Sequence, residues 1–175
     1  MTSKTLMDEV KEAGKILGVD NIESLRACVQ CGKCTGSCPS GRLTALRTRK
    51  LFLKVQLDMK DVISEDALWY CTTCYTCYER CPRGVKTTDI IRAIRNIAVK
   101  EGLMSDSHRK VVGYVLKTGH AVPINTATMK LREKLGLEKI PPTTHKHREA
   151  LESVQKIVRK TGLDKLIGFD WEEAK

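Results

Sequence analysis

Eight cysteines, arranged as two copies of one motif, are the residues of this chain best suited to do chemistry. Each copy has the form C-x2-C-x2-C-x3-C-P, with cysteines at positions 28, 31, 34 and 38 and again at 71, 74, 77 and 81. This spacing is typical of cysteines that bind [4Fe–4S] clusters. The sequence therefore predicts two [4Fe–4S] clusters held by cysteine thiolates.

The spacing also predicts which cysteines share a cluster. Three cysteines at steps of three residues lie along one tightly turned stretch, whereas the fourth, before a proline, points away from them. We therefore expect the fourth cysteine of each copy to complete the other cluster. The expected ligands are Cys28, Cys31, Cys34 and Cys81 for cluster 1, and Cys71, Cys74, Cys77 and Cys38 for cluster 2.

Zinc and disulfides are the competing uses of such cysteines. Structural zinc sites are usually built from two separated cysteine pairs, which these packed triplets do not resemble. No apolar signal-peptide core follows Met1, so we expect a cytoplasmic protein, in which disulfides are rare. Because the two motifs use every cysteine, no thiol is left for substrate chemistry and we predict no catalytic residue.

The residues between the cysteines differ in the two copies. Gly32 and Gly36 allow backbone N–H groups to approach the sulfurs of the first cluster. The second copy offers side-chain hydroxyls from Thr72, Thr73, Tyr75, Thr76 and Tyr78. Because hydrogen bonds to sulfur and solvent exposure shift cluster potentials, we expect the two clusters to have unequal potentials.

Apolar residues recur at helical spacing along the chain, and no segment shows sustained strand alternation. We expect Thr88 or Asp89 to cap the most regular helix and Gly102 to end it. Its apolar stripe consists of Ile90, Ile91, Ile94, Ile97 and Ala98. The predicted fold class is all-α.

The chain is expected to contain two domains. Residues 1–118 would form the two-cluster domain, and residues 119–175 a linker with a C-terminal helical extension. The charged tail from Leu163 is expected to take up structure only in a complex.

The chain carries 31 Lys and Arg against 21 Asp and Glu, a formal net charge of +10. In segment 41–60, Asp58 is the only acid beside Arg42, Arg47, Arg49, Lys50, Lys54 and Lys60. These cations could form solvated helix faces, a docking face or compensation for cluster charge. No nucleic-acid-binding module is visible and aromatics make up 5%, so we expect no nucleic-acid partner. No apolar run reaches the roughly 18 residues of a membrane span.

A helical insert over residues 39–70 separates the two motifs, unlike the short insert of small bacterial ferredoxins. The chain resembles the helical ferredoxin domain of multi-subunit oxidoreductases and, within that group, the iron–sulfur C subunit of cytosolic heterodisulfide reductase. The resemblance covers residues 6–118 and is carried by the segments CVQCGKCTGSCP, WYCTTCYTCYERCP and TTDIIRAIRNIAVKEG.

This resemblance implies a non-catalytic electron-transfer subunit of a methanogen-type complex. Its implied partners are a flavin-containing subunit and a catalytic subunit that reduces the heterodisulfide of coenzyme M and coenzyme B. Related two-cluster subunits of sulfur-oxidising enzymes, fumarate reductases or glycerol-3-phosphate dehydrogenases are alternatives. A nucleic-acid-processing iron–sulfur protein is a further alternative from a different class.

Overall fold

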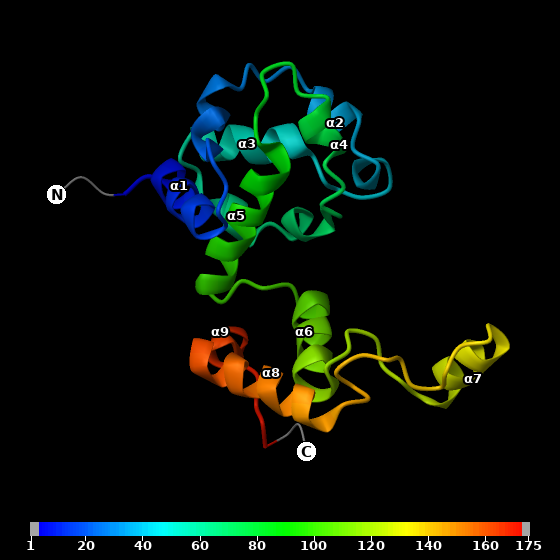
Figure 1. Ribbon diagram of the computed structural model, residues 1–175. Coiled ribbons are helices and arrows are strands. Elements are labelled where there is room, and N and C mark those ends of the chain that lie inside the picture. The colour runs from blue at the N-terminus through cyan, green and yellow to red at the C-terminus, as the bar shows by residue number, and fades with distance from the viewer. Residues whose placement is uncertain (1–3, 173–175) are drawn as a thin grey trace. The chain divides into compact units, whose positions relative to one another are not determined.

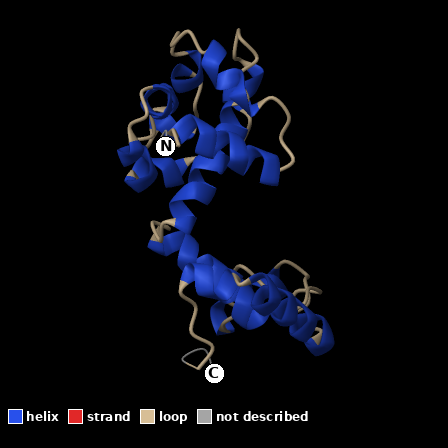
Figure 2. Cartoon of the chain, turned by 90° about the vertical axis from the view of Figure 1, so that its left-hand side faces the viewer, coloured by secondary structure: helices blue, strands red, loops and turns tan. Residues whose placement is uncertain are grey.

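The computed structural model describes residues 4–172 of the 175-residue chain. Residues 1–3 and 173–175 lie outside the described part. The first of these ranges belongs to the N-terminal segment in which we expect no signal peptide. Every regular element within residues 4–172 is a helix (Figure 2), which confirms the predicted all-α class. No helix in this part is both long and apolar enough to cross a membrane.

The chain divides into two compact units, Met1–Leu103 and Met104–Lys175. The division lies earlier than the boundary we predicted after residue 118. The difference is helix α6 (Asp106–Thr118), which packs against helix α8 (Arg148–Thr161) of the second unit and contributes the buried Leu116 to the core of that unit. Apolar periodicity in the sequence predicts that this helix forms. It does not show which other helix of the chain it packs against.

The first unit consists of longer helices joined by short helical turns (Figure 1). Its α-helices are α1 (Leu6–Ile16), α2 (Lys33–Gly36), α3 (Thr48–Gln56), α4 (Thr76–Glu79) and α5 (Thr87–Lys100). Its 3-10 helices are η1 (Ile22–Ala27), η2 (Ser40–Arg42), η3 (Lys60–Ser64) and η4 (Asp66–Tyr70).

The core of the first unit lies between α1 and α5, which pack along each other (Figure 1). The apolar stripe of α5 buries Ile90 and Ile94, and α1 contributes the buried Leu6 and Val10. Full burial of one such side chain stabilises the fold by about 1.5–3 kcal/mol. This packing holds α5 in place, so that its first turn can meet the second cysteine motif.

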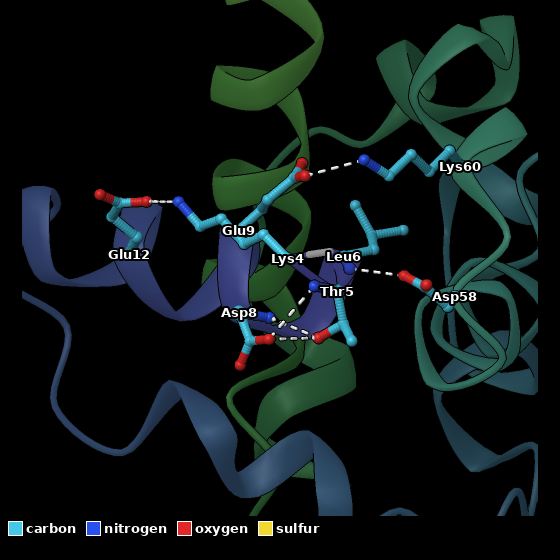
Figure 3. Close-up of polar contacts among 8 residues, drawn as sticks. All are labelled: Lys4, Thr5, Leu6, Asp8, Glu9, Glu12, Asp58 and Lys60. Atoms are coloured by element: carbon cyan, nitrogen blue, oxygen red, sulfur yellow. Dashed lines mark hydrogen bonds and ion pairs between the residues drawn. The ribbon is translucent and has the colours of Figure 1, made fainter. Parts of the chain in front are cut away.

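Polar contacts fix the start of α1 against the turn after α3 (Figure 3). Helix α1 begins with a capping box. The Leu6 amide donates to the Asp58 carboxylate at 2.5 Å, and Lys60 forms an ion pair with Glu9 at 3.0 Å. These contacts connect the N-terminal helix to α3, whose other end lies beside the first motif.

The second unit contains α6, α7 (Thr126–Lys134), α8 (Arg148–Thr161) and α9 (Leu163–Ile167). None of the side chains of α7 is buried. The tail from Leu163, which we expected to take up structure only in a complex, forms α9 and packs into the core. The indole of Trp171 donates to the Asp164 carboxylate at 2.7 Å.

The Asp164 carboxylate is expected to make the second unit sensitive to acid. The hydrogen bond from Trp171 lowers the pKa of Asp164. The charged form therefore stabilises the fold above its ordinary pKa of about 4, and this contribution is lost as pH falls through the lower folded-state value. We expect the urea midpoint, followed by Trp171 emission in Trp69→Phe, to fall as the pH is lowered from about 4.5 to about 2.5. Adding Asp164→Asn should weaken this dependence; an undiminished acid response would contradict the assignment.

Candidate metal centres

The two cysteine motifs fold into the same local structure. A four-residue helix begins two residues after the second cysteine of each copy, as α2 in the first and α4 in the second. Two residues of each copy have left-handed backbone, namely Gln30, Gly32, Thr73 and Tyr75. Because this conformation is unfavourable for residues other than glycine, its occurrence at equivalent positions indicates that the turn is required to orient the cysteines.

Two cavities in the first unit are each lined by four cysteines. The lining of one includes Cys28, Cys31, Cys34 and Cys81. The lining of the other includes Cys38, Cys71, Cys74 and Cys77. Each cavity thus takes three cysteines from one motif and the fourth from the other. The structure brings the eight cysteines together in the two groups that the spacing predicts.

The chemistry of the two cavities fits iron–sulfur clusters. Burial raises the pKa of the Cys34 thiol to about 11 and also raises that of Cys71. A buried thiolate therefore needs positive charge close to its sulfur, which cluster iron supplies. Within residues 4–172, no three His, Cys, Asp or Glu side chains form a group that could hold one metal ion. Four cysteine sulfurs around each cavity are instead the donor set of a [4Fe–4S] cluster.

Two buried threonines at the start of α5 contact a cysteine of the second cavity. The Thr87 hydroxyl donates to the Cys77 sulfur at 3.1 Å, and the Thr88 hydroxyl lies 3.4 Å from the same sulfur. Helix α5 begins at Thr87, so the predicted cap at Thr88 or Asp89 is wrong. The threonine hydroxyls face the sulfur, and no side chain caps the helix. Residue spacing did not predict this role, although both threonines lie just before Asp89 and the apolar stripe.

The hydroxyls predicted around the second cluster are arranged differently from our expectation. The threonine hydroxyls do approach a sulfur: the Thr76 oxygen lies 3.4 Å from the Cys74 sulfur, and hydrogen bonds with Thr76 and, to a smaller extent, Thr72 lower the pKa of Cys74. The Tyr75 and Tyr78 hydroxyls bond instead to charged side chains of segment 86–89. The tyrosines therefore support the packing of α4 against α5 rather than donating to sulfur.

Backbone amides after each motif contact the fourth cysteine. The Gly41 amide donates to the Cys38 sulfur at 3.3 Å, and the Val85 amide donates to the Cys81 sulfur at 3.4 Å. We expected such donors near Gly32 and Gly36 within the first motif, and residue spacing did not predict this pair of amides. The signal that the sequence offers for these donors is their position. Each amide follows the cysteine of a Cys-Pro pair by three or four residues.

The Gly41 position leaves no room for a side chain. A Cβ atom there would lie 2.8 Å from the Leu46 carbonyl oxygen and 3.3 Å from the Cys38 Cβ. We expect Gly41→Ala to destabilise the first unit by about 1–3 kcal/mol and to lower its iron content. Gly36→Ala is the control, because a Cβ there would meet nothing within 4 Å. Urea unfolding and iron assays should separate the two variants; equal behaviour would contradict the prediction.

The cations of segment 41–60 have several separate roles. Lys54 pairs with two carboxylates of the η3 region, and Arg47 donates to three backbone carbonyls of segment 41–46. Three cations line the first cavity, namely Lys33, Arg49 and Arg83. Of these three cations, Arg49 belongs to segment 41–60. Its place in the lining favours compensation of cluster charge as its role.

A helical unit with two cavities, each lined by four cysteines, defines the class as a helical ferredoxin-type iron–sulfur protein. A family model described as a 4Fe-4S dicluster domain matches residues 24–85, which include both motifs. The chain therefore binds two [4Fe–4S] clusters.

Relatives over most of the chain identify the family. The iron-sulfur C subunit of the CoB–CoM heterodisulfide reductase of Methanopyrus kandleri is 58% identical over 88% of this chain and 81% of the relative. The C 2 form of the same subunit from Methanocaldococcus jannaschii is 55% identical over 98% and 92%. The C subunit of the H(2):CoB-CoM heterodisulfide,ferredoxin reductase of Methanothermobacter thermautotrophicus is 52% identical over 97% and 88%. The chain belongs to this family of heterodisulfide reductase iron–sulfur subunits, which are components of an oxidoreductase complex.

Proposed function

We propose that this chain is the electron-transfer subunit of a cytoplasmic CoB–CoM heterodisulfide reductase. It relays electrons between a flavin-containing subunit and the catalytic subunit that reduces the heterodisulfide of coenzyme M and coenzyme B. The names of the relatives support this enzyme over a fumarate reductase or a glycerol-3-phosphate dehydrogenase. The pair of four-cysteine cavities in one unit is the observation that carries the relay.

The proposed ligands are the cysteines that line each cavity. Cluster 1 is assigned to Cys28, Cys31, Cys34 and Cys81, and cluster 2 to Cys38, Cys71, Cys74 and Cys77. Each bound cluster takes up and passes on single electrons. The polypeptide holds and shields the clusters, and every cysteine is used in doing so.

The exposure of the cysteines supports transfer to two partners. Cys31 in the first cavity and Cys74 in the second are exposed, whereas the other six are buried or half-buried. Each cluster would therefore approach the surface at one ligand, where a partner protein can exchange electrons. Helices α2 and α4 pack together, which brings the two motifs close enough for electrons to pass between them.

The relay can be tested in the whole complex by removing one cluster. We expect a complex that contains the Cys38→Ala/Cys74→Ala chain to keep electron-donor-driven reduction of its flavin. Reduction of the heterodisulfide should fall to background, because the path is interrupted after the flavin. A complex with Gly36→Ala, which retains all cysteines, is the control. Full heterodisulfide reduction by the double variant would contradict the relay.

A further inference from the structure

Arg95 of α5 lies beside the second cavity, where its position is fixed by several contacts. Its Nη2 donates to the Cys71 carbonyl oxygen at 2.7 Å. The Leu68 carbonyl oxygen accepts from Nη2 at 2.9 Å and from Nε at 3.1 Å. The guanidinium carbon lies 5.5 Å from the centre of the Trp69 ring. The charge of Arg95 is therefore held against the peptide of a proposed cluster ligand.

This cation has neutral oxygens as its hydrogen-bond partners. Within residues 4–172, no carboxylate forms an ion pair with Arg95, whereas Arg92 on the same helix pairs with Asp89 at 3.0 Å. Burial lowers the pKa of Arg95, and the Cys71 thiolate opposes this effect. Arginine nevertheless stays protonated in proteins, so a half-buried positive charge lies against the peptide of Cys71, a residue that lines the second cavity. A desolvated charge is costly unless an opposite charge compensates it.

We propose that Arg95 is a positioning residue that makes the second cluster easier to reduce. The cluster takes up one electron from a partner protein, and no bond forms or breaks in this step. Reduction adds one negative charge to a site that already holds four thiolates. A fixed cation beside Cys71 stabilises the reduced form more than the oxidised form. This role assumes the ligand set of the proposed function.

The test is a redox titration, followed by electron paramagnetic resonance, of the anaerobically purified chain with its clusters. We expect Arg95→Gln to lower the reduction equilibrium constant of the second cluster about tenfold, which is about 59 mV for one electron. Arg95→Lys should keep most of the original potential, because it keeps the charge. The signal that is lost in Cys74→Ala identifies the second cluster, and the potential of the first should not change.

Lys100→Gln is the matched control, because it removes one positive charge from the exposed end of the same helix. Equal second-cluster potentials in Arg95→Gln, Lys100→Gln and the unmodified chain would overturn the proposal. If Arg95→Gln does not retain the second cluster, Arg95→His decides. Its potential should fall as pH rises through the imidazole range, and a pH profile identical to that of the unmodified chain would overturn the proposal. An unmodified chain without two clusters would count against the proposed function instead.

Discussion

The double variant Cys38→Ala/Cys74→Ala is expected to retain about four irons per chain, whereas Cys34→Ala/Cys38→Ala is expected to retain almost none. Cys38 and Cys74 line the same cavity, so removing both affects one cluster. Cys34 lines the other cavity, so its loss together with Cys38 affects both clusters. The prediction is informative because Cys34 and Cys38 are close in sequence, whereas Cys74 is far away.

The single variants provide the reference for this comparison. Cys34→Ala and Cys38→Ala should each retain about four irons, measured with acid-labile sulfide after anaerobic purification. If each motif held its own cluster with all four of its cysteines, the two double variants would exchange their results. Four irons in Cys34→Ala/Cys38→Ala and almost none in Cys38→Ala/Cys74→Ala would therefore refute the crossed ligand sets.

Removal of the clusters is expected to unfold the first unit and to leave the second unit folded. Helices α2 and α4 have four residues each, far fewer than an isolated helix needs for stability in water. Cysteines from both motifs line each cavity, so a bound cluster would connect distant parts of the first unit and contribute to its folding. The second unit contains no cysteine and has its own core around Leu116, Val158 and Ile167.

The two tryptophans allow each unit to be followed separately. Trp69 is buried in the first unit, and Trp171 packs against Phe169 in the second. After iron chelation, we expect the emission of Trp69 in Trp171→Phe to shift to the red. The emission of Trp171 in Trp69→Phe should keep its wavelength and its urea midpoint. A buried Trp69 after complete iron removal, or a simultaneous shift of Trp171, would show that the prediction is wrong.

The features that the sequence predicts well are set by local spacing. The cysteine pattern predicted two groups of four, and the structure places Cys38 and Cys81 in the exchanged cavities. The apolar stripe of α5 predicted a helix with Ile90 and Ile94 in the core, and both are fully buried. In each case the relevant residues lie within one motif or one helix, so their relative positions follow from backbone geometry.

The features that were missed depend on contacts between distant segments. Arg95 and Thr87 belong to α5 but contact residues at or before the second motif, and helical periodicity does not show which segment a polar side chain will meet. The unit boundary at Leu103 was missed for the same reason, since it depends on the packing of α6 against α8. The left-handed backbone of Tyr75 could not be predicted from residue type, since tyrosine rarely adopts this conformation. The equivalent position in the first motif is Gly32, which adopts it easily.

The most direct measurement is the iron, the sulfide and the protein composition of the complex after anaerobic purification from its native source. We predict about eight irons and eight sulfides for each copy of this chain. We also predict that a flavoprotein and a subunit rich in Cys-Cys motifs co-purify with it. Eight irons with other partners would retain the electron relay but refute the proposed enzyme. Zinc in place of iron would contradict the two-cluster protein itself.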